Sequence, residues 1–147
     1  MKQLTQWLDS ANSRDTGLLL LRLFAGFALA FAHGYNKVFG DITKFAQGVK
    51  EMGFPAPELF ATLAGYSEFF GGLMLALGFG TRISTVMIAG TMIVAGFIRH
   101  ASDPFQAREL SLMYLYVATL FFFVGPGQYS IDGMIAKRKR KSQQPTQ

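Results

Sequence analysis

Glu68 is the residue of this sequence best placed to do chemistry, because its carboxylate lies inside a long apolar segment. The stretch AGYSEFFGGLMLALGFG at 64–80 has no other charged side chain, and residues 59–79 hold none besides Glu68. A charge near the centre of a bilayer costs at least about 2.5–3.5 kcal/mol. If the segment crosses a membrane, Glu68 must face the protein interior, pair with a cation or be protonated.

Basic partners for this carboxylate are present in an earlier apolar segment, at 17–39. Four of its residues lie within about 60° of one another on a helical wheel: Arg22, Gly26, His33 and Lys37. Another face carries the carboxylate between two glycines: Gly65, Glu68 and Gly72. Glycines at such spacing let helix backbones approach closely. We therefore expect the two faces to pack together and bring the ionisable groups with them.

Depth along the helices predicts a polar pocket on one side of the membrane. At 1.5 Å per residue, Glu68 lies roughly 15 Å below the outer end of its helix. His33 lies roughly 10 Å and Arg22 roughly 24 Å below the outer end of theirs. Glu68, and in addition Arg22, would form the base of the pocket. Three more ionisable residues flank the last connection on the outer side: Arg99, His100 and Glu109.

Such a pocket has the groups that a quinone requires, namely donors to two carbonyl oxygens and a route for protons. His33 and Lys37 would donate, Glu68 would relay protons and Arg22 would tune Glu68. The predicted catalytic residues are Glu68 and His33. The predicted ligand-binding residues are Arg22, Lys37, Tyr66, Arg99, His100 and Glu109.

Structural roles remain alternatives for the same side chains. Arg22 would snorkel to the interface, His33 would be a hydrogen-bonded core residue, and Glu68 would bridge helices as a neutral acid. The three residues of the last connection also fit ordinary loop-flanking positions. Some aromatic residues suit either the pocket or an aromatic belt at the membrane surface: Tyr66, Tyr114 and Tyr116.

Metal and thiol chemistry find little support. The chain has no cysteine, which excludes disulfides, thiolate metal sites and thiol redox chemistry within it. No two histidines lie three or four residues apart, so a zincin-like site is unsupported. His33 and His100 differ in depth by roughly 10 Å, which disfavours a haem held by both. No metal is predicted, and the cofactor stays open, with quinone as a candidate and haem disfavoured.

Four apolar blocks must position these residues, at 17–39, 58–79, 82–98 and 109–124. Only 16% of the 147 residues are charged, against about a quarter in soluble domains. A bilayer-spanning helix needs about 20 mostly apolar residues. The blocks show no sustained alternation, which disfavours a β-barrel. The prediction is an all-α, transmembrane four-helix antiparallel bundle, forming one membrane domain over 1–134.

The connections complete this outline. In the first loop, the spacing of Phe45, Val49 and Met52 predicts a short helix on the outer surface. The turn GFGTR at 78–82 is so short that the second and third spans must be antiparallel neighbours. Thr81 is the expected N-cap of the third span. The polar lead before residue 17 is either an interfacial helix with Trp7 among the headgroups or a frayed terminus.

Charge predicts the orientation. Eight basic residues lie on the side of the termini: Lys2, Arg14, Arg82 and the five of KRKRK at 137–141. Five lie on the other side: Lys37, Lys44, Lys50, Arg99 and Arg108. The bias places both termini in the cytoplasm. The basic segment 135–147 is predicted to be a disordered cytoplasmic tail facing anionic lipid rather than nucleic acid.

Three motifs together resemble the DoxX family of small four-span bacterial membrane proteins: RLFAGFALAFAHGYNKV, EFFGGLMLALGFGTR and GPGQYSID. The resemblance runs from about residue 18 to 134. It implies a bacterial inner-membrane protein with a redox link, because relatives include a membrane subunit of a thiosulfate:quinone oxidoreductase. It implies no particular reaction, since most members have no established activity.

The favoured hypothesis is an integral component of an oxidoreductase system that binds a quinone or similar small redox molecule, with a partner redox subunit. The alternative is a non-enzymatic membrane anchor or small-solute permeation unit. In a third, purely structural reading the charges only fix helix register. Self-association into a homo-oligomer is compatible with a bundle of this size.

Overall fold

The computed structural model describes residues 11–143, and every regular element in that range is helical. Four helical rods are long and apolar enough to cross a membrane: Ala11–Phe39, Pro57–Leu77, Thr81–Arg99 and Phe105–Val124. The prediction of an all-α, four-span bundle is therefore confirmed. The expected helix around Trp7 lies largely outside the described residues.

Three of the four rods change helix type along their length. The first consists of α2 (Ala11–Phe27), the π-helix η1 (Ala28–Gly34) and α3 (Tyr35–Phe39). The second consists of α5 (Pro57–Tyr66), the π-helix η2 (Ser67–Gly71) and α6 (Gly72–Leu77). The third is α7 (Thr81–Ile93) followed by the π-helix η3 (Val94–Arg99). Only the fourth, α8 (Phe105–Val124), is a single α-helix.

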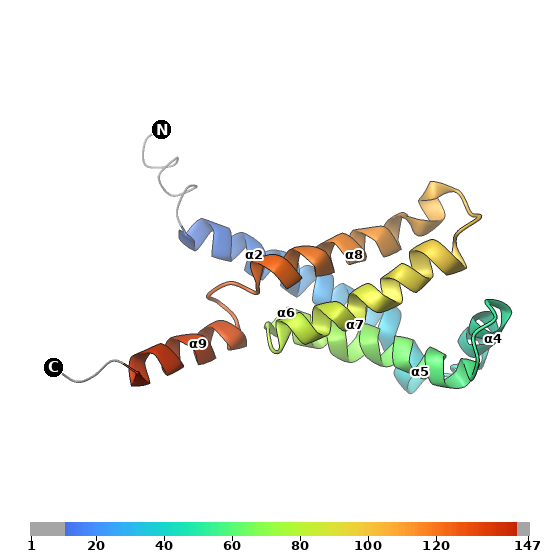
Figure 1. Ribbon diagram of the computed structural model, residues 1–147, viewed down its shortest axis with the longest axis horizontal. Coiled ribbons are helices and arrows are strands. Elements are labelled where there is room, and N and C mark those ends of the chain that lie inside the picture. The colour runs from blue at the N-terminus through green and yellow to red at the C-terminus, as the bar shows by residue number, and fades with distance from the viewer. Residues whose placement is uncertain (1–10, 144–147) are drawn as a thin grey trace.

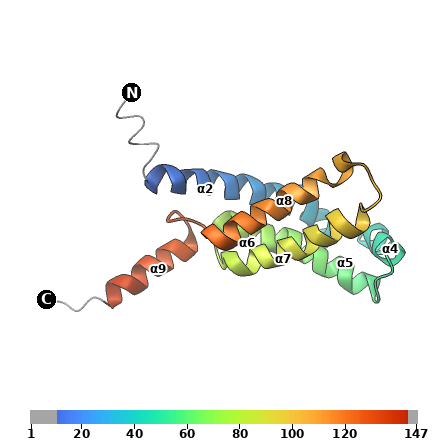
Figure 2. The same cartoon turned by 45° about the horizontal axis from the view of Figure 1, so that its top comes forward.

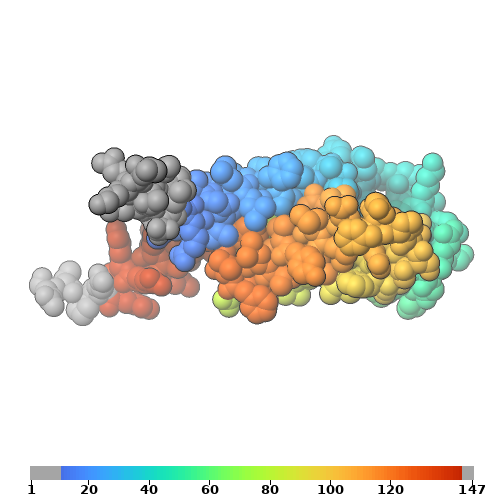
Figure 3. Space-filling model, turned by 90° about the horizontal axis from the view of Figure 1, so that it is seen from above, coloured from blue at the N-terminus to red at the C-terminus, as the bar shows by residue number. Residues whose placement is uncertain are grey.

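The molecule is elongated, and its two ends differ. The surface helix predicted in the first loop is present as α4 (Thr43–Glu51), at the end of the bundle opposite α9 (Ile131–Ser142) (Figure 1). The rotated view places the beginning of α2 at the same end as α9 (Figure 2). Space-filling atoms show the segment of α4 at the far end from α9 as well (Figure 3). We call the end that carries α4 the distal end.

The first two rods pack closely because glycines face each other. A Cβ placed on Gly26 would come within 2.5 Å of the Gly72 carbonyl oxygen, and one on Gly72 within 2.7 Å of the Gly26 carbonyl oxygen. Small residues at such a crossing give van der Waals contact between backbones, which drives helix association in lipid. The predicted pairing of these two faces is thus correct.

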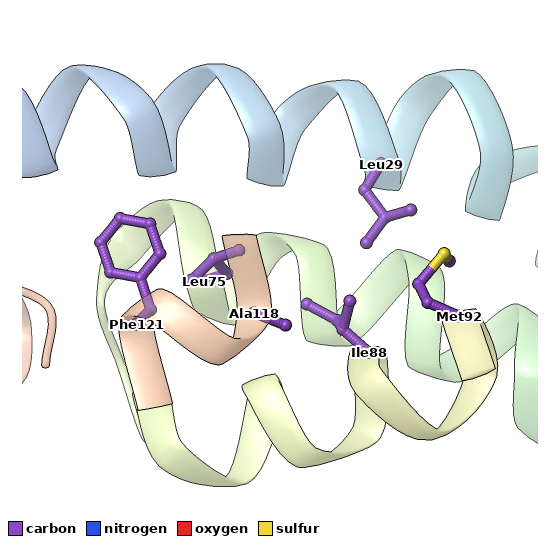
Figure 4. Packing of buried hydrophobic residues seen from close by; sticks show 6 residues of the cluster. All are labelled: Leu29, Leu75, Ile88, Met92, Ala118 and Phe121. Carbon is purple, nitrogen blue, oxygen red and sulfur yellow. The ribbon is translucent and has the colours of Figure 1, made fainter. Parts of the chain in front are cut away.

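The core lies where the four rods meet. Six buried side chains form it, and they point toward one another from α6, α7, α8 and η1 (Figure 4): Leu29, Leu75, Ile88, Met92, Ala118 and Phe121. On α8 the opposite face is exposed and apolar, as expected for a surface that contacts lipid tails: Met113, Tyr116 and Phe123.

Two details differ from the sequence expectations. The segment from residue 135 is not disordered throughout, because α9 continues to Ser142. Ser130 caps that helix by accepting a hydrogen bond from the Gly133 N–H at 3.0 Å, and three basic residues in its last turn complement the helix dipole. Second, α7 is not capped by Thr81. Its cap is Gly80 in a left-handed conformation, aided by Asp132 from beyond α8.

Candidate functional site

Glu68 forms a buried ion pair with Lys37. The Lys37 Nζ lies 2.7 Å from Oε1 and 2.6 Å from Oε2 of Glu68. The Glu68 side chain is 6% exposed and that of Lys37 is 23% exposed. Lys37 Nζ also lies 4.3 Å from the centre of the Phe45 ring on α4, a cation–π contact. The expected basic neighbour from the first rod is therefore present, and it is Lys37 rather than His33 or Arg22.

Glycines and π-helical turns bring these two side chains together. A Cβ on Gly34 would lie 2.4 Å from the Phe69 N, and one on Gly65 would lie 2.9 Å from the Lys37 Cβ. Glu68 lies in η2, which packs against η1. π-helical turns are rare and occur frequently at functional sites. In this protein they place the carboxylate where the first rod is nearest.

The ion pair lines a cavity of about 780 Å³ in the distal half of the molecule. This volume lies within the range of about 300–1,000 Å³ typical of small-molecule sites. Most of the wall is apolar. Helix α4 contributes Phe45 and Val49, and other elements contribute Phe54, Leu63, Met92 and Leu110. Polar side chains line it from all four rods, among them His33, Ser67, Arg99 and Tyr114.

His33 and Tyr114 line the same cavity from η1 and α8. Their ring centroids are 5.9 Å apart in an edge-to-face arrangement. Tyr114 therefore belongs to the cavity, which the sequence left open. Tyr66 does not line it; its ring is exposed and contacts Phe70 at a centroid distance of 5.5 Å. Tyr116 is exposed too, as a lipid-facing residue would be.

The predicted residues of the last connection divide into two groups. Arg99 and His100 line the cavity, and His100 Nδ1 lies 2.7 Å from an oxygen of Asp103. Glu109 is exposed on α8 and is not part of the cavity wall. Lys44 on α4 also lines the cavity, although the sequence did not indicate it. The cavity wall thus carries more positive than negative side chains.

Arg22 lies in a different polar cluster, near the start of α9. Its guanidinium donates to the carbonyl oxygens of Ala76 and Tyr129, and the side chain is buried. It neither reaches Glu68 nor snorkels to solvent. The cause is that α6 supplies the Ala76 carbonyl oxygen and the turn before α9 supplies the Tyr129 carbonyl oxygen at that depth.

Asp132 completes this second cluster, which we call the Arg22–Asp132 cluster. Its carboxylate accepts hydrogen bonds from Gly80 N at 2.9 Å, Thr81 N at 2.9 Å and Thr81 Oγ1 at 2.8 Å. Burial acts to raise the pKa of Asp132, but these hydrogen bonds and the nearby Arg22 charge outweigh it, so the pKa is lowered. The motif GPGQYSID thus fixes the turn between the second and third spans.

Sequence reasoning missed Ser67 and the contribution of α4 to the wall. Ser67 is buried, lines the cavity and precedes Glu68 directly. Two residues of a normal α-helix that are adjacent in sequence point about 100° apart, so Ser67 was not expected beside the carboxylate's cavity. The signal for α4 was the spacing of Phe45 and Val49, which predicted a surface helix without indicating what it covers.

Comparison with known proteins agrees with this architecture. The DoxX family model matches residues 17–101. The chain is 31% identical over 130 residues to the inner membrane protein YqjF of Escherichia coli (strain K12), covering 84% of this chain and 95% of YqjF. It is 28% identical over 130 residues to the putative oxidoreductase CatD of Bacillus subtilis (strain 168), covering 88% of this chain and 94% of CatD. No solved structure matches.

The family match includes the Lys37–Glu68 pair and Arg22, all inside residues 17–101, whereas Asp132 lies beyond the matched residues. Four membrane-length helices and the inner membrane relative together make this a multi-pass membrane protein. The chain belongs to the DoxX family.

Proposed function

We propose that this protein is an inner-membrane component of an oxidoreductase system and binds a quinone or a similar small redox molecule in the distal cavity. The observation that carries the proposal is the buried Lys37–Glu68 pair in the wall of an otherwise largely apolar cavity of about 780 Å³. The similarity to a protein named as a putative oxidoreductase supports the redox assignment.

The proposed chemistry is the conversion of one quinone, two electrons and two protons into one quinol. A reduced partner protein supplies the electrons. Lys37 donates a hydrogen bond to one carbonyl oxygen of the ring, and Glu68 relays the proton that this oxygen takes up as it gains charge, while the other carbonyl oxygen takes up the second proton. His33 is placed to serve the ligand from η1, in contact with Tyr114. The apolar wall holds the ring and keeps water from the reacting oxygens.

Orientation forms part of the proposal, with both termini in the cytoplasm and the cavity in the outer half of the membrane. The chain has no native cysteine, so a single introduced cysteine can be labelled without background. In intact cells, a membrane-impermeant maleimide should label Lys50→Cys on α4 and spare Ser142→Cys on α9. Labelling of the second variant alone would reverse the orientation.

The binding test uses the purified full-length protein in lipid nanodiscs. Lipid-soluble molecules retained after gentle extraction are identified by mass spectrometry, and quinone affinity is then titrated for the wild type and Glu68→Gln. We expect retained quinone and a loss of affinity of about 10-fold or more in the variant, because a charged hydrogen-bonding group is removed. Glu58→Gln is a matched control, since Glu58 is an exposed carboxylate in the same rod.

Equal affinity of Glu68→Gln and wild type would remove Glu68 from the site. Absence of any quinone binding by the wild type would contradict the proposal as a whole. A flux of small solutes through protein-containing liposomes without any redox change would instead favour a permeation unit.

A further inference from the structure

Ser67 carries a buried hydroxyl group that has no hydrogen-bond partner within the described part of the chain. The residue is 5% exposed, and its Oγ lies among the buried polar atoms without a partner. Ser67 also lines the distal cavity. A polar group kept out of water without a partner is unfavourable, so such a group calls for an explanation.

Several other hydroxyls on the membrane-spanning rods are satisfied by their own helix. Three threonines donate to the carbonyl oxygen four residues earlier, at 2.8–3.3 Å: Thr62, Thr91 and Thr119. This local bond is the usual way for Ser and Thr to be satisfied in a helix. Ser67 does not make it, although a helical turn precedes it. Its hydroxyl is therefore available to something else.

The position of Ser67 indicates which kind of partner its hydroxyl can bind. Ser67 is the first residue of the π-helix η2, and the next residue is Glu68, whose carboxylate is held by Lys37. All three residues line the cavity. A ligand that enters this polar region meets an ammonium group with a proton left over. A rotation of the adjacent Ser67 side chain, whose Oγ is itself buried, would turn its hydroxyl toward the ligand, and both groups are donors. The matching partner is an oxygen that accepts hydrogen bonds.

We propose that Ser67 donates a hydrogen bond to an acceptor oxygen of the ligand and thereby makes the cavity selective for carbonyl-bearing aromatic molecules. This inference rests on the proposed function, because it concerns the same cavity. It goes further by naming the group that distinguishes an oxidised quinone ring from an aromatic hydrocarbon of the same shape. The hydroxyl stays unpaired in the empty protein so that the ligand can use it.

Two probe molecules test the selectivity directly. Menadione and 2-methylnaphthalene share one carbon skeleton, and only menadione has the two carbonyl oxygens. Their affinities are measured for the full-length protein in nanodiscs by intrinsic fluorescence or calorimetry. The wild type should prefer menadione, and Ser67→Ala should reduce that preference by about 3- to 10-fold, the value of one hydrogen bond.

Thr91→Val is the matched control. Thr91 lies in the cavity wall, but its hydroxyl is bonded to its own helix at Met87. The preference for menadione should therefore stay within about 2-fold of the wild type. An equal loss in both variants would overturn the assignment, because it would report a general change in the wall and not a bond from Ser67.

Thermal unfolding separates a ligand-binding role from a structural one. If Ser67 serves the ligand, Ser67→Ala should unfold at the same or a higher temperature without ligand, because an unpaired buried hydroxyl is removed. A lower unfolding temperature together with an unchanged preference would overturn the proposal. Failure of the wild type to bind menadione at all would instead contradict the proposed function, so the two failures are distinguishable.

Discussion

The two polar clusters of this bundle have similar ingredients but different surroundings. Among the described residues each keeps one buried atom without a hydrogen-bond partner, Arg22 Nε in one and Ser67 Oγ beside the other. In the Arg22–Asp132 cluster, the aspartate accepts three hydrogen bonds and the arginine donates to two carbonyl oxygens. In the distal cavity, Lys37 and Glu68 pair, yet the neighbouring Ser67 hydroxyl has no partner among residues 11–143 and an open volume adjoins them. The first cluster holds a turn and stabilises the fold, whereas the second adjoins an open volume that a ligand can occupy.

The backbone shows the same contrast. Around Asp132, Gly78 and Gly80 have positive φ values of 63° and 55°, and a tight turn is held by the aspartate. Around the cavity, three rods carry π-helical turns that loosen the regular register. The chain therefore has a hydrogen-bonded turn at the end near α9 and a cavity beside π-helical turns at the distal end. A substitution in the Arg22–Asp132 cluster should therefore lower stability and leave quinone affinity unchanged, whereas a substitution at the cavity should lower quinone affinity.

The largest effect is expected from Asp132→Ala. The variant loses three hydrogen bonds to a carboxylate, leaves the first N–H groups of α7 without a cap and removes the negative charge near Arg22. The free energy of unfolding should fall by about 3 kcal/mol or more. Thermal unfolding in detergent measures it. Quinone affinity at a temperature where the variant is folded should stay near that of the wild type, and a selective loss of affinity would contradict the division into two clusters.

Lys37→Met should have the next largest effect on stability and the larger effect on binding. It leaves the Glu68 carboxylate buried without its cation, which costs about 1–3 kcal/mol. The double variant Lys37→Met with Glu68→Gln should recover most of that stability, because no orphan charge remains. It should not recover quinone affinity. Recovery of binding as well would show that the pair only fixes the register of two helices.

Gly34→Ala tests the close approach that creates the cavity. A Cβ there would lie 2.4 Å from the Phe69 N, so the first two rods must separate, at about 1–3 kcal/mol. Stability and quinone affinity should fall together, as followed by unfolding and titration. Gly90→Ala is the control on α7, where a Cβ would meet nothing within 4 Å. It should be neutral or slightly stabilising, since alanine favours a helix.

Much of the fold could be predicted from the sequence, because a bilayer restricts the choices severely. Long apolar blocks must be helices there, and the short GFGTR turn requires antiparallel neighbours. The glycines at 26, 65 and 72 indicated which faces meet, and the structure has them in contact. Glu68 was also expected to pair with a basic residue of the first rod, and it does.

The partners within the site were harder to predict, because helical wheels assume one helix type. The π-helices η1 and η2 change the angle between successive residues, so depth and wheel position favoured His33 where Lys37 makes the bond. Arg22 was misplaced for another reason. One of its acceptors, the Tyr129 carbonyl oxygen, comes from the turn before α9, which is remote in sequence and has no periodicity to reveal that it folds back.

The smallest effect is a pH dependence confined to the Arg22–Asp132 cluster. The pKa of Asp132 is lower in the folded protein than in the unfolded chain, where it is about 3.9. The carboxylate therefore contributes stability above that value, and the contribution is lost as pH falls below it through the folded pKa. The difference in unfolding temperature between the wild type and Asp132→Asn should be constant near neutral pH and should shrink below about pH 4. A difference that stays the same at acid pH would show that the ionised form of Asp132 is not what holds the turn.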